Sequence, residues 1–362
     1  MGINILLPLA GENTYETTNS NQFPRLLSEV DGKLLLERAA EGLIDIERRN
    51  KFIAVIPKLA VKKFNLDSVL SLTLPNLDTC IVNDKTKGSV CSALLAIDKL
   101  DIKAPLIITS LEQIINWDLN CFIDTIRSKG SDAGVLTFNS VHPKWSFVNQ
   151  NDDGIVTQAA EKRPISNNAI AGFYYFEQTK DFIEAAKNLI RKDVKFDGSF
   201  YVSETLNELI LRGKKVLSLN IPKERYHHFH DEHSLDSFQS NRLKKSILNS
   251  TIYELTRGYI DAFNSMDIDK IKSYFSNDFS LRDPEVYIEG KEEVCSYIRS
   301  IFNSVQKLEF KAENIIVEKN KSVIEFILRI DNETFIGTDV IYWQDDKKMH
   351  KMNAYLFGAE DE

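Results

Sequence analysis

Residues 3–27 read INILLPLAGENTYETTNSNQFPRLL, an apolar run followed by a polar loop that contains one glycine, Gly11, and no lysine. A helical pattern, KLLLERAAEGLI, follows at residues 33–44. A loop that leaves a strand and enters a helix is where α/β proteins hold phosphate groups, because backbone N–H groups there can bind anions. The stretch predicts an α/β fold, and it raises the question of whether the loop still carries phosphate-binding groups.

The same alternation continues to about residue 140. We expect strands at 3–9, 52–57, 79–83, 105–110 and 133–138, separated by helices at 33–44, 58–64, 89–100 and 120–130. Strands that are almost continuously apolar predict a parallel sheet covered on both faces. Ligands of such sheets lie beyond the carboxyl ends of the strands. This places residues 11–22, 86–89 and 110–118 around one cleft.

The pattern changes after about residue 245. Helical segments come first, with a break at Met266–Asp267 and a further helix at 291–305, and long strands close the chain. The strands are expected at 279–283, 307–319, 322–331, 334–344 and 348–357. This order is typical of a separate α+β domain. We therefore predict two domains, 1–240 and 246–362, joined by a polar stretch at 236–249.

Composition limits the classes of function. The 362 residues carry a net charge of −8, which disfavours nucleic acid and anionic membranes as partners. No run of about 18 apolar residues indicates a membrane span, so we expect a cytoplasmic protein. The four cysteines lack metal-ligand spacing and are expected to be reduced thiols: Cys80, Cys91, Cys121 and Cys295.

Several motifs in the first 240 residues resemble those of the sugar-phosphate nucleotidyltransferases with a GT-A-like fold, especially a branch from bacterial capsule and surface-polysaccharide clusters. That family opens with L-A-G-x-G-x-R, continues with P-K-P-L and V-x-G-K-P, and later has N-S-D-Q-x-x-x-W-D. The matching segments here are Leu9-Ala10-Gly11, FPRLL at 23–27, VDGK at 30–33 and SLEQIINWD at 110–118. The resemblance implies a nucleotide-binding domain that contains Leu9, Ala10 and Gly11.

The departures from the family pattern fall on its catalytic positions. Asn13 stands in place of the second glycine, Tyr15 in place of the arginine, and Arg25 in place of the lysine. Arg25 keeps a positive charge for phosphate, whereas Tyr15 does not. The metal-binding aspartate falls on Glu112, a carboxylate that can still bind Mg²⁺.

The resemblance also implies sugar contacts and a second metal ligand. Gly88 either lets the base or ribose lie against the backbone or simply begins a helix. The histidine-rich run RYHHFHDEH (225–233) contains Asp231, which would supply the second metal carboxylate, and its histidines could bind a transition metal. The expected sugar-binding residues are Glu161, Lys162, Gly172 and Glu204.

From about residue 246 the chain resembles the nuclear-transport-factor-2-like, or SnoaL-like, fold, through YIDAFNSMDIDKIKSYFSNDFSLRDPE, the GKEEVCSYI helix and the long strands. The resemblance implies a curved sheet around a cone-shaped pocket, with Asp283, Asp339 and His350 as polar candidates. Strand alternation allows Asp339 and His350 to point outward. The other interpretation is a packing and dimerisation module, which the apolar residues on both faces of the closing strands favour.

We therefore expect nucleotidyl transfer from an NTP, with Mg²⁺, to a sugar phosphate or similar phosphorylated metabolite, in bacterial surface-polysaccharide synthesis and as a homodimer. Arg25 and Glu112 would be the catalytic residues. Two alternatives remain at this point. The first is a degenerate homologue that binds nucleotide or sugar phosphate without turnover, and the second is a C-terminal pocket that acts on the sugar.

Overall fold

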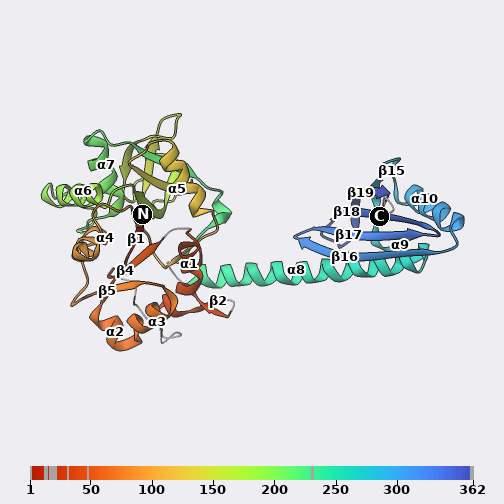
Figure 1. Ribbon diagram of the computed structural model, residues 1–362, viewed down its shortest axis with the longest axis horizontal. Helices are drawn as coiled ribbons and strands as arrows, with labels where there is room; N and C mark the ends of the chain where they lie inside the picture. The colour runs from red at the N-terminus through yellow and green to blue at the C-terminus, as the bar shows by residue number, and fades with distance from the viewer. Residues whose placement is uncertain are drawn as a thin grey trace. The chain divides into compact units, whose positions relative to one another are not determined.

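The computed structural model describes residues 2–11, 15, 23–30, 32–46, 49–229 and 232–358. It divides into two compact units, residues 1–238 and 239–362. Each unit, drawn as a ribbon in Figure 1, has its own hydrophobic core. The boundary between the units falls within helix α8 (Glu232–Asn264).

The N-terminal unit is built on a mixed sheet of nine described strands. Its main path runs β10-β9-β11-β6-β1-β4-β5, and β8 pairs with both β11 and β12. The parallel part contains β1 (Ile3–Pro8), β4 (Asn50–Pro57), β5 (Leu77–Val82) and β6 (Leu106–Ile108). The other strands are β8 (Ala133–Asn139), β9 (Phe147–Gln150), β10 (Val156–Ala160), β11 (Asn168–Phe176) and β12 (Val216–Asn220).

Helices cover both faces of this sheet, as the apolar strands predict. Successive side chains of a strand point to opposite faces, so Ile5 and Leu7 of β1 belong to one core cluster and Leu6 to another. Helices α1 (Leu35–Ile44), α2 (Lys58–Phe64), α3 (Leu66–Thr73) and α5 (Leu119–Ser128) contribute to the first cluster. Helices α4 (Ser89–Leu95), α6 (Thr179–Arg191) and α7 (Val202–Leu211) contribute to the second.

The sheet is mixed, but the five strands expected from the apolar runs, β1, β4, β5, β6 and β8, all run in one direction, as predicted. β11 runs antiparallel to both β6 and β8, and β9 and β10 form an antiparallel pair. In the strand order β11 lies directly beside β6, and the chain leads from the carboxyl end of β6 to Glu112. Two small ribbons lie near this edge of the sheet: β2 (Glu29–Val30) with β3 (Lys33–Leu34), and β7 (Gln113–Ile115) with β13 (Tyr226–His228).

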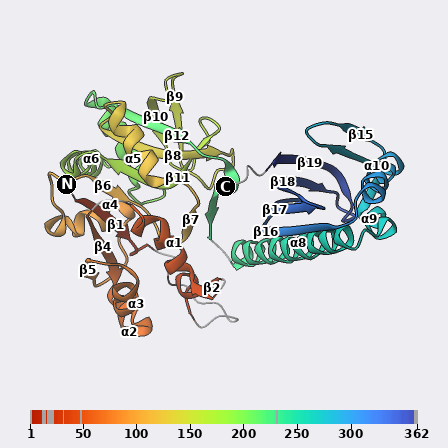
Figure 2. The same cartoon turned by 45° about the vertical axis from the view of Figure 1, so that its right-hand side comes forward.

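The C-terminal unit packs helices against one face of a six-stranded sheet (Figure 2). Its helices are α8, α9 (Ile268–Tyr274) and α10 (Lys291–Ser304), and the joining stretch 236–249 is part of α8. The strand order is β15-β14-β19-β18-β17-β16. Their bounds are β14 (Phe275–Arg282), β15 (Tyr287–Glu289), β16 (Leu308–Glu318), β17 (Lys321–Ile330), β18 (Glu333–Trp343) and β19 (Met349–Gly358).

The helix break expected at Met266–Asp267 is present. Met266 has a φ of 51°, in the left-handed region that ends helices, and the Asp267 carboxylate accepts a hydrogen bond from the backbone N–H of Lys270. Among the described residues, no helix combines the length and apolar character that crossing a membrane requires. All four cysteines are free thiols in this structure.

Candidate functional site

Tyr15, Arg25 and Glu112 meet at the carboxyl edge of the parallel strands. The guanidinium Nη2 of Arg25 lies 3.9 Å from Oε1 of Glu112. The Tyr15 phenol lies close enough to Glu112 for the two to interact electrostatically. The structure therefore brings together three of the positions at which the sequence departs from the nucleotidyltransferase pattern.

Short backbone contacts hold Glu112 in this place. The residue follows β6, and its backbone N–H donates to the Ser110 hydroxyl at 3.1 Å. Its carbonyl oxygen accepts from the N–H of Phe229 at 2.9 Å, next to the β7–β13 ribbon. Arg25 begins a single 3-10 turn after Pro24, which has an extended conformation.

The three side chains are partly buried, and their innermost polar atoms do not pair with one another. Within the described residues, Tyr15 Oη, Arg25 Nε and Glu112 Oε1 are buried and have no hydrogen-bond partner. Burial raises the pKa of Glu112 to about 7, against the opposing effect of Arg25, and burial also raises the pKa of the Tyr15 phenol. Buried polar groups without partners cost free energy, so a ligand that hydrogen-bonds to them would be stabilised. The cluster offers two donors and one acceptor to such a ligand.

Gly88 has a structural reason that does not require a nucleotide. Its φ is 96°, and a Cβ built on it would lie 2.3 Å from the carbonyl oxygen of Phe200. The backbone N–H of Phe200 donates to the carbonyl of Lys87, and that of Val90 donates to the carbonyl of Phe200. Gly88 therefore allows two backbone segments to approach closely where α4 begins. A contact of Gly88 with a base or ribose stays a prediction.

Glu161 and Glu204 lie side by side, but protein groups engage both carboxylates. Glu161 Oε2 accepts hydrogen bonds from the hydroxyls of Ser146 and Ser203, the latter at 2.6 Å. Glu204 Oε1 accepts from the backbone N–H of Glu161 at 2.8 Å, and its Oε2 accepts from Asn207 at 2.9 Å. Burial raises the pKa of Glu161. No sequence pattern singled out the two serines.

Lys162 and Gly172 have different environments. The Lys162 ammonium lies over the rings of Phe196 and Tyr201, 5.6 and 5.4 Å from their centres, which suits a cation. Gly172 has a φ of 60°, and its carbonyl accepts from the Gln113 side chain at 3.1 Å. Gln113 also accepts from the Tyr226 hydroxyl at 3.0 Å. Gln113, next to Glu112, thus connects the segment that carries the Glu112 carboxylate to β11. Sequence analysis did not single out Gln113, although it belongs to the SLEQ part of the motif at 110–118.

Asn13 and Asp231 lie outside the described residues, so their predicted roles stay predictions. Of the histidine-rich run, His227 packs against Phe238 with ring centres 4.7 Å apart, and His228 packs against Trp145 at 5.4 Å. The two histidines are neighbours on β13 and point to opposite sides. Over the described residues, no group of three or more His, Cys, Asp or Glu side chains is placed to hold a metal ion.

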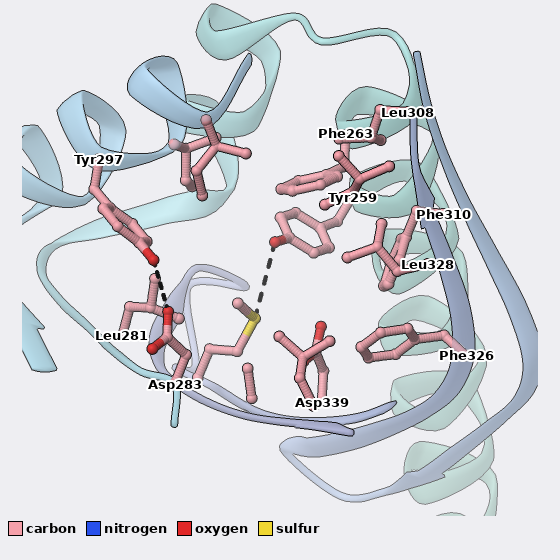
Figure 3. A pocket seen from close by; sticks show the side chains of 16 residues that line it. Tyr259, Phe263, Leu281, Asp283, Tyr297, Leu308, Phe310, Phe326, Leu328 and Asp339 are labelled. Atoms are coloured by element: carbon pink, nitrogen blue, oxygen red, sulfur yellow. Dashed lines mark hydrogen bonds between the residues drawn. The ribbon is translucent and has the colours of Figure 1, made fainter. Parts of the chain in front are cut away.

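The C-terminal unit contains a partly open cavity of about 160 Å³ between its helices and the inner face of its sheet (Figure 3). Asp283 and Asp339 line it, whereas His350 does not. Asp339 points inward, which is one of the two orientations that strand alternation had left open. It lies on the same face of β18 as Ile341 and Trp343, both of which are buried in the core.

Comparison with known proteins agrees with this division. Residues 256–348 match the family described as SnoaL-like domain. A nucleoside-diphosphate-sugar pyrophosphorylase from Vibrio cholerae RC9 is similar in structure, with 19% identity, a TM-score of 0.56, and coverage of 65% of this chain and 99% of that one. No curated protein sequence matches the chain significantly.

A second solved structure has a similar fold. It is a Bacillus anthracis protein assigned as a glucose-1-phosphate thymidylyltransferase, in complex with sucrose, with 15% identity and a TM-score of 0.52. The match covers 66% of this chain and 94% of that one. The chain thus joins an α/β unit, similar in fold to nucleotide-sugar pyrophosphorylases, to a SnoaL-like domain.

Proposed function

We propose that the N-terminal unit binds an NTP and a phosphorylated sugar or similar metabolite, and transfers the nucleotidyl group between them. The observation that supports this most strongly is the cluster of buried, unpartnered polar atoms on Tyr15, Arg25 and Glu112. It lies at the carboxyl edge of a parallel sheet, where α/β proteins bind ligands. The fold similarity to a pyrophosphorylase supports the same reaction class.

Arg25 and Tyr15 would bind phosphate oxygens in this reaction. The phosphate of the acceptor attacks the α-phosphorus of the NTP in line, the new P–O bond forms, and the bond to pyrophosphate breaks with the electron pair leaving on pyrophosphate. The free Nε–H of Arg25 can donate to an oxygen that gains charge in this step. The Tyr15 hydroxyl can donate a second, neutral hydrogen bond. Arg25 supplies the charge and Tyr15 supplies orientation.

Glu112 fits a role as Mg²⁺ ligand. Its Oε1 is a buried carboxylate oxygen with no hydrogen-bond partner among the described residues, and Mg²⁺ prefers such hard oxygen ligands with substrate phosphates and water around it. A bound Mg²⁺ would supply charge neutralisation for the phosphates. Asp231 would be a second ligand. Arg25, at 3.9 Å, would balance part of the Glu112 charge when the metal is away.

We also propose that the protein acts in the cytoplasm, in bacterial surface-polysaccharide synthesis, as a homodimer that pairs through the outer face of the C-terminal sheet. That face carries exposed apolar side chains, among them Ile316, Ile336 and Phe357, which are 53, 54 and 67% exposed. Large exposed apolar side chains on one face of a sheet are suited to an interface with a second copy. The polysaccharide role is carried only by the sequence resemblance.

Two other functions remain in competition with transfer. The missing arginine at position 15 favours a protein that binds nucleotide or sugar phosphate without turnover. The structure gives less support to a C-terminal pocket that acts on the sugar. Sixteen residues line this pocket, and all of them are apolar except two tyrosines and two aspartates. A sugar buried there would leave most of its hydroxyls without partners.

Pyrophosphate release by the full chain tests the proposal. Each of the four NTPs is paired with a panel of sugar 1-phosphates in the presence of Mg²⁺, and nucleotide binding is measured in parallel by equilibrium dialysis. Release with at least one pair supports transfer. Nucleotide binding in the absence of pyrophosphate release from every pair supports the protein that binds without turnover. Absence of both rejects a nucleotide site in the N-terminal unit.

A further inference from the structure

The cavity of the C-terminal unit has one buried polar group that the protein leaves unpartnered. Asp339 is 5% exposed, and its Oδ1 has no hydrogen-bond partner within the described residues. The residue lies on the inner face of β18, opposite Ile324 of β17 and Ala354 of β19. An unpaired acceptor in such surroundings is destabilising unless something in the cavity pairs with it.

The other carboxyl group of the cavity is already fully engaged. Asp283 Oδ1 accepts from the backbone N–H groups of Glu285 and Val286, each at 2.8 Å, and Oδ2 accepts from the Tyr297 hydroxyl at 2.9 Å (Figure 3). These bonds fix the turn between β14 and β15. Asp283 therefore shapes one wall of the cavity, and Asp339 is the carboxyl group that faces it with free hydrogen-bonding capacity.

A second polar group is held only weakly. The Tyr259 hydroxyl, from α8, donates to the Met352 sulfur at 3.9 Å, and sulfur is a poor acceptor. In Figure 3 this hydroxyl and the Asp339 carboxyl enter the same space from the helix and from the sheet. The Tyr259 side chain is 1% exposed, so bulk water cannot replace this weak hydrogen bond.

We propose that this cavity is a binding site for a small, mainly apolar molecule about one ring in size, whose single hydroxyl group hydrogen-bonds to Oδ1 of Asp339. The volume sets the size, because an engineered cavity of about 150 Å³ is large enough to bind benzene. The walls set the character: Phe263, Phe310 and Phe326 present aromatic faces and edges to the space.

A hydroxyl suits Asp339 in either protonation state. Burial raises the pKa of Asp339 to about 7, so both the carboxylate and the carboxylic acid are populated near neutral pH. A hydroxyl can donate to the first and accept from the second. The ligand is distinct from the phosphorylated substrates of the N-terminal unit, whose charges this cavity could not solvate.

Binding of four probes to the full chain tests this proposal: phenol, cyclohexanol, toluene and glucose, each titrated by saturation-transfer NMR at millimolar concentrations. We expect saturable binding of phenol and cyclohexanol, and none of glucose. In Asp339→Leu, the affinity of phenol relative to toluene should fall about tenfold, the loss of one buried hydrogen bond. Asp339→Asn, which keeps a hydrogen-bonding group, should retain phenol binding.

Two further variants locate the site. Ala354→Leu fills the cavity from β19 without touching the carboxyl group and should abolish binding of phenol and toluene alike. Thr338 is next to Asp339 in the chain and lies on the opposite face of β18. Thr338→Val should therefore leave binding unchanged. The proposal is overturned if no apolar probe binds saturably, if the phenol-to-toluene ratio is the same in Asp339→Leu, if Ala354→Leu binds as wild type does, or if glucose competes.

Discussion

Arg25 and Glu112 face each other at 3.9 Å, too far for a hydrogen bond and close enough for their charges to interact. Both side chains are less than a fifth exposed, and each retains an unpartnered atom. A fully formed bidentate pair would have used the hydrogen-bonding capacity of both groups. The observed separation leaves each group able to bind its own part of a ligand, which under the proposed function would be a phosphate for Arg25 and a cation for Glu112.

Glu112→Gln should lower Mg²⁺-dependent pyrophosphate release by about a hundredfold or more, because the amide keeps the size of the side chain but loses the charge that binds a metal. Steady-state release at saturating Mg²⁺ measures the effect. Asp98→Asn, an exposed site in the same unit, is the control and should behave as wild type. Equal rates for Glu112→Gln and wild type would place Glu112 outside the site.

Tyr15→Arg combined with Asn13→Gly should raise kcat, because it restores a cation and a small residue at positions where the sequence departs from the transferase pattern. The new guanidinium would face Glu112 and the phosphates, and one such donor is worth about 10²-fold in rate. Tyr15→Phe is the matched variant, since it removes only the unpartnered hydroxyl. A lower kcat in the double variant would mean that this loop serves another ligand.

The apolar runs predicted most helices and strands, but the direction of β11 and the inner face of β18 could not be predicted from them. Whether β11 runs parallel or antiparallel depends on the path of the chain before it, which local patterns do not record. On β18, alternation divides Asp339, Ile341 and Trp343 from Ile336, Val340 and Tyr342. Both sets are largely apolar, so the pattern alone does not say which faces the core.

Within the candidate site, the sequence pointed to Arg25, Tyr15 and Glu112 because each occupies a motif position. It did not show that Glu161 and Glu204 are engaged by Ser203, Asn207 and the backbone. The contacts of Glu161 with Ser203 and of Glu204 with the Glu161 backbone join segments more than forty residues apart in the chain. They depend on the packing of α7 against β10, which follows from the completed fold and from no single motif.

Gly88→Ala should destabilise the N-terminal unit, because the added Cβ would lie 2.3 Å from the Phe200 carbonyl oxygen in addition to the strain of a φ of 96°. Gly198→Ala is a matched control, with a φ of 76° and open space around its Cβ. Urea denaturation should show a loss of several kcal/mol for the first variant and about 1 kcal/mol for the second. Similar losses in the two variants would mean that the positive φ alone, and not the contact with Phe200, accounts for the glycine at position 88.

Ile336→Lys should convert a dimer of the full chain into a monomer. Ile336 lies opposite Phe357 on neighbouring strands, and both side chains are more than half exposed on the outer face of the sheet. A charge buried in an apolar interface would be strongly destabilising. Light scattering at micromolar concentration measures the mass, and a chain truncated near Asn241 should also be monomeric. A monomeric wild-type chain would reject pairing through this face.

Asp339→Asn should remove a pH dependence from the stability of the C-terminal unit. Burial raises the pKa of Asp339 to about 7, whereas the unfolded chain has a value of about 3.9. Between these two values the unfolded state loses its proton and the folded state keeps it, so the free energy of unfolding falls as pH rises from about 4 to about 7 and stays low above it. The variant should therefore match wild type in free energy of unfolding near pH 4 and exceed it by a few kcal/mol at pH 8.

Hydrogen exchange of β17–β19, followed by mass spectrometry, reports on this unit alone. Glu333→Gln, exposed on the same strand as Asp339, is the control. A constant difference between Asp339→Asn and wild type across this range would show that Asp339 is ionised in the folded protein throughout.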